Sequence, residues 1–600
     1  MRIVTIDFES YFDKEFTLKK LSTEAYVRDK RFAVHGAAIK WGPDYAARWY
    51  NADQLKQVLA DEDWSNTAIL AHHAQFDSLI LTHHFGVKPK LWLDTLSMAR
   101  HNLGNHHSAS LDSVRGQFNI PVKRTPYERF KSRHWRELDE ATQQELAAGC
   151  CDEVESIYFI FNQLAKTFPS EEYAVIDLTI RMFVEPVLRA DTALLAKLWE
   201  EEEHGKRARL EALNINGADL SSNAAFCALL QAEGVEISYK DGKAGPIPAL
   251  AKTDEFMREL LEDDDDRIRG LAEARLGIKS TLLQTRAETL GFMAQRGALA
   301  VYLRYCGAHT TRWSGGDRSN FQNFKRGSEL RKAILAPDGY LLATVDLSQI
   351  ECRLLNFLAG QTDVVERFRN GADPYVAIAS QFYGRAIGKD SPAERGTGKQ
   401  AELSCGYGCG GKRFRSTARL GIYGPPVSLT DDEAQRAVDL YRASHPNVVK
   451  LWRDAGNLLP YIFGRLSTPF LDCMHVKDAK LYLPNGTWID YQTLEWHADE
   501  TDAYWRIKTR QGFSKMYGAK LVENFVQALA RVIMSQACLR IAKQFRPVLS
   551  SHDEWSFLVP NDGYASTSLD FITNEMKREP QWLPGIPIDC EGGLSKRYDK

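Results

Sequence analysis

The sequence predicts a multidomain protein that combines α/β and α+β architecture. Its 600 residues exceed what a single hydrophobic core holds, so we expect about three to four domains. Residues 1 to about 165 alternate buried strand patterns with helical patterns, which is typical of an α/β unit. Farther along, Asp346 and Asp553 each accompany a strand-like apolar run, about two hundred residues apart, which indicates a second sheet built from distant segments.

The first half of the chain changes from mixed to helical patterning. Ile3–Ile6 and Ala68–Ala71 are predicted as buried strands, and Thr142–Leu164 as a helix. From about residue 170 to 300, charged and apolar stretches such as Asp191–Ala212 predict a largely helical region.

The second half alternates strands and helices again. Leu341–Val345 is predicted as a strand, and residues 373–455 as helices that begin at a capping Asp373 followed by Pro374. Residues 465–510 are rich in Thr, Tyr, Trp and Asn and predict β-hairpins. Val522–Phe545 predicts a helix that leads into a strand, a turn and a strand around His552.

The composition is that of an ordinary globular protein and does not by itself identify a binding partner. The net charge is only −3, but a nucleic-acid binder needs a basic stripe rather than a basic total. The ten cysteines are scattered without paired CxxC spacing, so we expect reduced structural thiols and no zinc site. No window reaches the ~18 apolar residues of a membrane span. A strand pattern begins at Ile3, which leaves no room for a targeting segment, so we expect a cytoplasmic protein with no membrane partner.

Three segments of the second half carry candidate chemistry. Asp346, with Glu351 one helical turn later, and Asp553, at the tip of a hairpin, can bring two carboxylates together across a sheet. Carboxylates from separate strands suit a pair of magnesium ions. Between them lie Arg395, Lys399, Leu403 and Tyr407, whose spacing of four predicts one helical face with a cationic end suited to a triphosphate.

The N-terminal region carries a second set of carboxylates. Asp7 and Glu9 are two residues apart on the first predicted strand and therefore project from one face. Asp77 and Asp152 follow. Four such carboxylates can hold two metal ions that activate water against a phosphodiester.

Together these segments resemble the family A DNA polymerases. The order of Asp346, the Arg395–Tyr407 helix and Asp553 is similar to the palm, fingers and palm motifs of that family, over residues 300 to 600. The N-terminal carboxylates resemble its 3′→5′ proofreading exonuclease domain. The resemblance implies an RNase H-like exonuclease domain at 1–165, followed by a right-hand polymerase. Its parts would be a helical thumb at 166–310, palm at 311–370, fingers at 371–455, and palm with a β-hairpin insertion at 456–600.

The resemblance also implies residue roles. Asp346 and Asp553 would bind two Mg²⁺ ions, and Asp7, Glu9, Asp77 and Asp152 would bind Mg²⁺ or Mn²⁺ in the exonuclease site. Arg395 and Lys399 would contact dNTP phosphates, Tyr407 would lie near the templating base, and Glu351 would exclude a ribose 2′-hydroxyl. The implied contacts to primer–template DNA are Arg312, Asn320, Gln322, Asn323, Gln527 and His552.

Several departures from the family pattern bear on function. Leu403 stands where many relatives carry an aromatic residue, and Tyr375 stands where bacterial relatives bind a phosphate with His. Ala147 and Ala148 occupy the usual places of the His or Tyr that orients the attacking water. Leu403 and Tyr375 resemble the phage branch of the family, and the compact layout that begins with the exonuclease-like domain favours a viral polymerase that works in a bacterial cytoplasm. Replicases of this kind often act with a helicase, a single-strand-binding protein or a processivity factor.

Alternative functions remain open from the sequence. The N-terminal domain can keep its fold and bind DNA without cutting it. A single-subunit RNA polymerase shares the palm and fingers, although Glu351 and the exonuclease layout argue against it. A non-catalytic DNA-binding protein is disfavoured by the intact Asp346 and Asp553, and a nuclease that uses its polymerase half only as a clamp is a further alternative.

Overall fold

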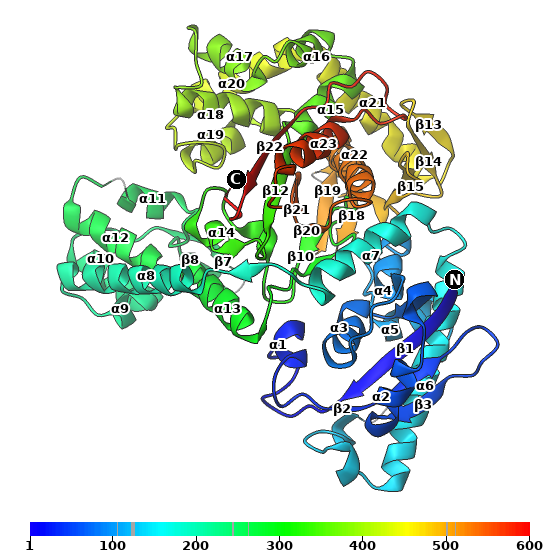
Figure 1. Ribbon diagram of the computed structural model, residues 1–600. Helices are drawn as coiled ribbons and strands as arrows, with labels where there is room; N and C mark the ends of the chain where they lie inside the picture. The colour runs from blue at the N-terminus through cyan, green and yellow to red at the C-terminus, as the bar shows by residue number, and fades with distance from the viewer. Residues whose placement is uncertain are drawn as a thin grey trace. The chain divides into compact units, whose positions relative to one another are not determined.

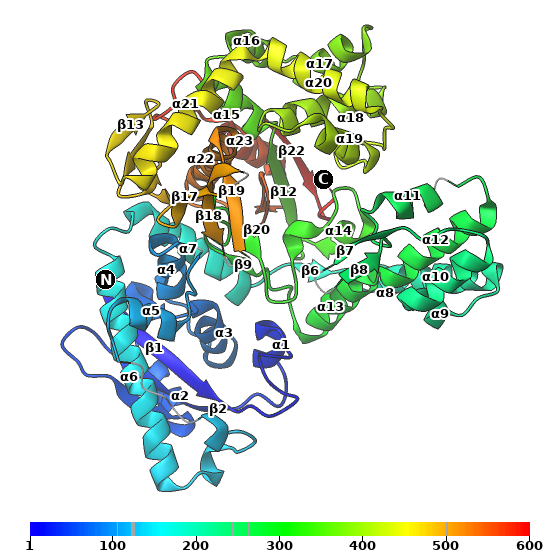
Figure 2. The ribbon, with the colours of Figure 1, turned by 180° about the vertical axis from the view of Figure 1, so that it is seen from behind.

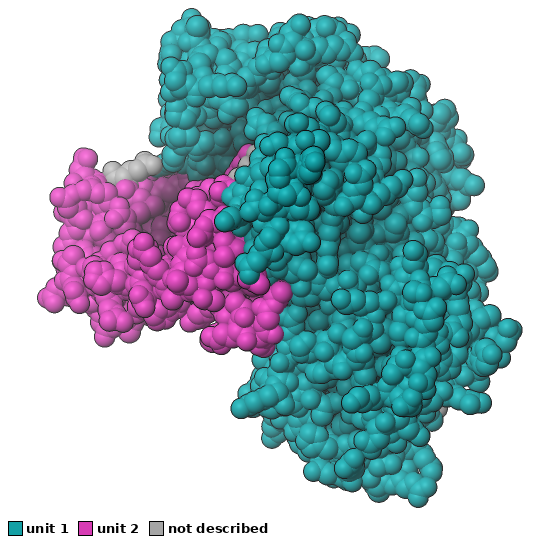
Figure 3. All heavy atoms as spheres, in the orientation of Figure 1, with its two compact units in different colours: residues 1–188, 300–323, 336–596 teal, residues 189–299, 324–335, 597–600 magenta. Residues whose placement is uncertain are grey.

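The computed structural model describes residues 1–104, 106–121, 127–242, 245–261, 263–499, 502–509 and 512–599 (Figure 1). The chain folds into two compact units, coloured separately in Figure 3. Unit 1 comprises residues 1–188, 300–323 and 336–596, and unit 2 comprises residues 189–299, 324–335 and 597–600. None of the helices in the described part is both long and apolar enough to serve as a membrane span.

Unit 1 begins with a five-stranded mixed sheet in the order β3-β2-β1-β4-β5. The central strand β1 runs antiparallel to β2 and parallel to β4. Val4, Ile6 and Phe8 bury their side chains, while Asp7 and Glu9 lie on the opposite face, as strand alternation requires. The strands are β1 Arg2–Ser10, β2 Val34–Lys40, β3 Arg48–Asn51, β4 Thr67–Ala71 and β5 Leu91–Asp94.

Helices surround this sheet, and the longest of them begins at a side-chain cap. The Asp139 carboxylate accepts a hydrogen bond from the amide of Thr142, which satisfies one of the free amides in the first turn. The helices are α1 Thr23–Val27, α2 Ala52–Ala60, α3 Ala74–Phe85, α4 Thr95–Asn102, α5 Leu111–Gln117, α6 Glu140–Leu164 and α7 Ser170–Val184, with 3₁₀ turns at Trp64–Asn66, Tyr127–Arg129 and Trp135–Glu137.

A second sheet of unit 1 is antiparallel and has the order β20-β21-β12-β22. Strand β12 pairs with β21 so that Asp346 lies opposite Glu554. Helices α15, α22 and α23 accompany these strands (Figure 1). The elements are β12 Tyr340–Leu347, α15 Ile350–Ala359, α22 Gly518–Ile541, β20 Pro547–Ser551, β21 Glu554–Pro560, α23 Ala565–Lys577 and β22 Cys590–Ser595, with short strands β9 Leu303–Arg304 and β10 Ser314–Gly315 and a 3₁₀ turn at Phe321–Asn323.

Helices fill the chain between α15 and the hairpins, as the sequence predicts. Asp373 caps α17 by accepting from the Tyr375 amide, and Pro374 occupies the first turn. The helices are α16 Thr362–Arg369, α17 Pro374–Tyr383, α18 Pro392–Gln400, α19 Gly411–Arg419, α20 Asp431–Ser444 and α21 Pro446–Phe463.

Two small antiparallel sheets occupy the predicted hairpin region. Residues 500, 501 and 510 of the range 465–510 lie outside the described residues. One sheet has the order β13-β14-β15-β16 and the other β17-β18-β19, which continues to Met516. The strands are β13 Thr468–Phe470, β14 Met474–Lys477, β15 Lys480–Tyr482, β16 Trp488–Asp490, β17 Leu494–Ala498, β18 Ala503–Thr509 and β19 Gly512–Met516.

Unit 2 is mainly helical and has its own core around Phe226, Met257 and Leu271. The Arg331 guanidinium stacks over the Tyr598 ring at 3.7 Å, which ties the C-terminal residues into this unit. Its elements are β6 Arg189–Ala190, α8 Thr192–Leu213, α9 Gly217–Ser221, α10 Asn223–Ala232, β7 Tyr239–Gly242, β8 Gly245–Pro248, α11 Glu255–Leu261, α12 Asp266–Lys279, α13 Leu282–Arg296, α14 Glu329–Lys332 and β11 Ile334–Leu335.

A buried ion pair joins α7 to α22 within unit 1. Both Arg531 terminal nitrogens donate to the Glu172 carboxylate at 2.6 Å, and the two side chains are only 1% and 3% exposed. Tyr305 and Asn485 donate to the same carboxylate at 2.6 and 2.8 Å. Burial opposes the charged carboxylate, but Arg531 outweighs burial, so the pKa of Glu172 is lowered.

Glu172→Gln should therefore destabilise the protein by about 3–5 kcal/mol, because it leaves Arg531 buried without its counter-charge. The expected result is a thermal unfolding midpoint several degrees lower, measured by calorimetry. Glu171→Gln, at the exposed neighbouring position, is the matched control and should leave the midpoint unchanged. Equal midpoints for the two variants would contradict a stabilising role for the pair.

Candidate active sites

Strands β12 and β21 bring Asp346 and Asp553 together. Asp346 is the penultimate residue of β12, and Asp553 lies in the turn between β20 and β21. The Leu347 amide donates to the Asp553 carbonyl at 2.9 Å, which fixes this turn against the end of β12. Burial and the neighbouring Asp346 carboxylate raise the pKa of Asp553 to about 7. The two carboxylates therefore form one tight acidic pair.

This pair fits a divalent cation. Two adjacent carboxylates repel each other, and the raised pKa of Asp553 reflects that repulsion together with burial. A bound Mg²⁺ would remove both penalties, since carboxylate oxygens are its preferred protein ligands. The residues present therefore match the chemistry of the metal expected from the sequence.

Glu351 lies beside the pair and is held by two other candidate residues. Arg312 forms an ion pair with one carboxylate oxygen of Glu351, and the Tyr407 hydroxyl donates to the other at 3.3 Å. Burial and Glu351 raise the pKa of Tyr407. Arg312, Glu351 and Tyr407, which have separate predicted roles, therefore contact one another in the structure.

The cationic helix is interrupted. The spacing of four predicts one helical face from Arg395 to Tyr407, but this segment is not a single α-helix. Helix α18 ends at Gln400, and Ala401–Cys405 form a π-helix. A π turn has more residues than an α turn, so the helical repeat changes between Lys399 and Tyr407.

Arg395 is oriented by α17. Its guanidinium forms an ion pair with Asp373 at 2.7 Å and lies over the Tyr375 ring at 5.2 Å. Burial raises the pKa of Tyr375, so its hydroxyl stays protonated. Gly398 allows α17 and α18 to approach, because a Cβ there would lie 2.0 Å from the Tyr375 carbonyl oxygen. Sequence reasoning did not single out Asp373 or Gly398 for these roles.

Three of the predicted DNA contacts, Arg312, Gln322 and His552, lie near the acidic pair. Arg312, Gln322, His552 and Asp553 line one cavity. The Asn320 side chain accepts from the Gln322 amide at 3.0 Å, and the Gln322 carbonyl accepts from Ser551 at 3.3 Å. Asn323 is exposed in the same 3₁₀ turn. Gln527 accepts from Thr310 at 3.2 Å.

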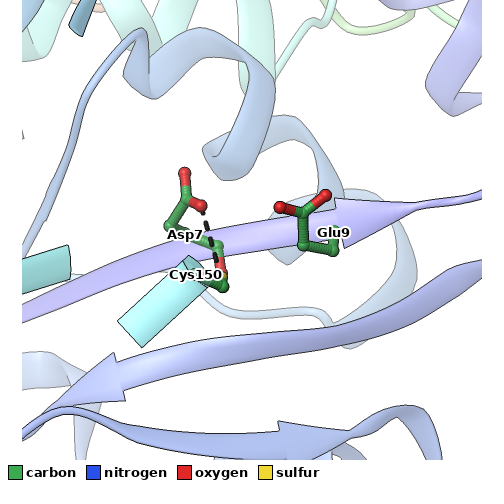
Figure 4. Close-up of side chains that lie close together, drawn as sticks. All are labelled: Asp7, Glu9 and Cys150. Atoms are coloured by element: carbon green, nitrogen blue, oxygen red, sulfur yellow. Dashed lines mark hydrogen bonds between the residues drawn. The ribbon is translucent and has the colours of Figure 1, made fainter. Parts of the chain in front are cut away.

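The N-terminal sheet carries a second acidic cluster, which includes a cysteine. Figure 4 shows Asp7 and Glu9 projecting from the same side of β1, with Cys150 beside Asp7. The Cys150 thiol donates to the Asp7 carboxylate at 3.3 Å, and one possible ligand atom from each of the three residues lies within 4.8 Å of the other two. Cys150 is predicted from the sequence only as a structural thiol, and no motif spacing marks its place beside Asp7.

Asp77 completes the cluster from α3. Its carboxylate accepts from the Phe8 amide at 3.1 Å, next to both β1 acids. Burial and Glu153 raise the pKa of Asp7 to about 8, and burial and Asp7 raise the pKa values of Glu9 and Asp77. This concentration of buried negative charge fits a divalent cation.

Glu153, rather than Asp152, faces this cluster. Asp152, the predicted fourth carboxylate, forms an ion pair with the buried Arg115. Glu153 instead acts on the pKa values of Asp7 and Glu9. The reason is helical geometry: Cys150 and Glu153 are three residues apart on one face of α6, and Asp152 is turned away by about 100°.

A tyrosine from another segment also reaches the cluster. The Tyr127 hydroxyl donates to Glu153 at 3.2 Å. Burial, Glu9, Glu153 and Asp7 raise the pKa of Tyr127, in that order of importance. Ala147 and Ala148 lack a polar side chain, whereas Tyr127 brings a hydroxyl group to Glu153. Tyr127 lies outside α6, so the residue spacing of the exonuclease motif does not predict it.

Comparisons with known proteins point to one family of polymerases. Residues 197–457 match the model of DNA polymerase family A. The DNA polymerase of Bacillus phage SP02 is 23% identical, with 100% of both chains covered. The thermostable DNA polymerase I of Thermus aquaticus is 26% identical over 44% of this chain, which spans only 31% of that protein.

Structural comparison gives the same fold. The POL domain of Pol1 from M. smegmatis, solved in complex with DNA primer-template and dNTP, superposes with a TM-score of 0.67 at 17% identity. The match covers 99% of this chain and 95% of the other, so the likeness extends over both the N-terminal sheet and the β12–β21 sheet.

Proposed function

Because the chain belongs to DNA polymerase family A, we propose that it extends a DNA primer by template-directed addition of deoxynucleotides. The observation that carries the proposal is the acidic pair of Asp346 and Asp553 at the meeting of β12 and β21. The full-length similarity to a phage DNA polymerase supports a role in phage genome replication in a bacterial cytoplasm. A helicase, a single-strand-binding protein or a processivity factor are further proposed partners.

Each candidate residue has a role in this reaction. When bound at Asp346 and Asp553, two Mg²⁺ ions would supply Lewis-acid activation of the primer 3′-hydroxyl and neutralise the departing pyrophosphate. Lys399 and Arg395 bind and orient the triphosphate through charge-assisted hydrogen bonds, with Arg395 aimed by Asp373. His552 and Arg312 position the primer end beside Asp553 in the shared cavity.

The assay for this function is extension of a labelled primer on a DNA template with magnesium and either the four dNTPs or the four NTPs. We expect stepwise extension with dNTPs and little with NTPs. Extension with NTPs alone would favour the RNA polymerase alternative, and no extension with either set would overturn the proposal.

Glu351 should act as the gate against ribonucleotides. Arg312 and Tyr407 hold its carboxylate in place, so the side chain can fill the space of a 2′-hydroxyl. Glu351→Ala should raise the ratio of CTP to dCTP incorporation by about tenfold or more, because a pocket contact that rejects one small group accounts for effects of this size. Glu351→Gln keeps the volume and is the matched control. An unchanged ratio in the alanine variant would remove Glu351 from this role.

We also propose that the N-terminal sheet is a 3′→5′ exonuclease site. When bound at Asp7, Glu9 and Asp77, Mg²⁺ or Mn²⁺ would supply an activated water for attack on the terminal phosphodiester. Glu153 takes the place that the sequence assigned to Asp152, and Tyr127 orients the attacking water in place of the residues missing at 147 and 148. The alternative is a domain that binds DNA without cutting it.

A further inference from the structure

The three-stranded sheet β17–β19 has two different faces. Pairing places Trp496 opposite Trp505, and their side chains share one face of the sheet. Trp505 lies against Phe463 at the end of α21, with ring centroids 5.3 Å apart. This face is therefore partly covered by α21, and the strands follow one another beside α21 and α22 in Figure 2.

The opposite face alternates aromatic rings with cations. Arg506 stacks over Phe513 at 4.0 Å, and Lys515 lies over Tyr504 at 3.9 Å. Pairing of Lys508 with Phe513 and of Arg506 with Lys515 places these side chains on the same side. Phe513 is 53% exposed. We call this surface the aromatic–cation face; it consists of Tyr504, Arg506, Lys508, Phe513, Lys515 and Tyr517.

Acidic neighbours offset most of the positive charge of this face, and one of them, Asp499, acts on Lys515 together with Asp502. Glu495 pairs with Arg506 at 2.6 Å and Asp502 with Lys515 at 2.5 Å, so two of the three cations have acidic neighbours. Lys508 adds a further positive charge. The aromatic rings therefore have to supply most of the binding free energy. The cations orient the nucleic-acid backbone and add little long-range attraction.

One end of the aromatic–cation face lies beside Tyr407, the candidate template position. Tyr517 follows β19 in an extended conformation and is 46% exposed, so Phe513, Lys515 and Tyr517 project on one side. A Cβ on Gly408 would lie 3.8 Å from the Tyr517 ring, and Gly408 follows Tyr407 directly. From Tyr517 to Phe513 the strand covers about 13 Å. The face thus begins beside Tyr407 and leads away from it.

We propose that the aromatic–cation face binds the single-stranded template before it reaches the templating position. This inference rests on the proposed polymerase function. Exposed rings stack on unpaired bases of any sequence, and neighbouring cations contact the backbone, which is how sequence-independent single-strand binders work. A duplex would not use these rings, because its bases already stack on one another.

The test is binding of labelled primer–templates without dNTPs, at template 5′ overhangs of one and ten nucleotides. Phe513→Ala and Tyr517→Ala should each weaken binding of the ten-nucleotide overhang by about five- to a hundredfold, the range for one lost base stack. Binding of the one-nucleotide overhang by Phe513→Ala should match wild type. Trp496→Ala removes an equally exposed ring (50%) from the opposite face and should bind both substrates normally.

Three outcomes would overturn the inference. Equal weakening at both overhang lengths would assign the rings to duplex binding, and no weakening would leave them without a DNA role. A third substrate, with a blunt template end and an unpaired primer 3′ end, separates the two strands: selective loss there would assign the face to the primer strand and also overturn the proposal. Binding is measured without catalysis, so failure of the polymerase assay is a distinct result.

Discussion

Replacement of Asp346 or Asp553 by asparagine should reduce primer extension by about a thousandfold, which corresponds to about 4 kcal/mol of activation free energy. Asparagine keeps the volume of each side chain but removes the charge that the pair offers to cations. The hydrogen bond from the Leu347 amide to the Asp553 carbonyl holds the two carboxylates at one site, so loss of either should disable it. Rapid-quench primer extension at saturating dNTP measures the effect.

Asp562→Asn is the matched control for this pair. Asp562 lies beyond the far end of the seven-residue strand β21, where its carboxylate accepts from the Tyr564 amide. The control should extend primers like wild type, and all three variants should bind primer–template DNA. Wild-type extension by Asp346→Asn or Asp553→Asn would move the reaction to another site.

The second large effect concerns excision. Asp7→Asn with Glu9→Asn should abolish 3′→5′ degradation while extension stays within about twofold of wild type, because these acids lie on a different sheet from Asp346 and Asp553. Tyr127→Phe should slow excision by about a hundredfold, since a positioned polar group contributes roughly 10²–10⁴ to such reactions. Degradation of a labelled single strand with magnesium or manganese measures both.

Asp53→Asn with Asp61→Asn provides the control for excision. These acids belong to α2 and its C-cap, on the same domain, and should leave degradation unchanged. If wild-type protein leaves single-stranded and mispaired 3′ ends intact with either metal, the N-terminal domain only binds DNA. Unchanged excision by Tyr127→Phe, with loss in the double variant, would leave the carboxylates in place and remove Tyr127 from the site.

The site residues that could be predicted from the sequence are those whose positions follow from strand pairing and strand alternation. Asp346 follows a buried apolar run, and Asp553 lies at the tip of a hairpin, so strand pairing alone could bring them together. Asp7 and Glu9 share a face because strand alternation has a period of two. The capped start of α17 at Asp373 and Pro374 also follows from local chemistry.

The remaining parts depend on tertiary packing. Asp152 and Glu153 are neighbours, and only the rotation of α6 against β1 decides which carboxylate faces Asp7. Tyr127 comes from a 3₁₀ turn with no motif to mark it. The π-helix at Ala401–Cys405 follows a glycine-containing segment whose propensity does not specify where the extra residue enters.

The most direct measurement of templated synthesis uses four primer–templates that differ only in the first templating base, each supplied with one dNTP at a time and magnesium. The enzyme should add one nucleotide rapidly only in the four Watson–Crick combinations, and Asp553→Asn should add none at a comparable rate. Rapid addition of the same nucleotide regardless of the templating base, or equal addition by Asp553→Asn, would contradict template-directed synthesis at the Asp346–Asp553 pair.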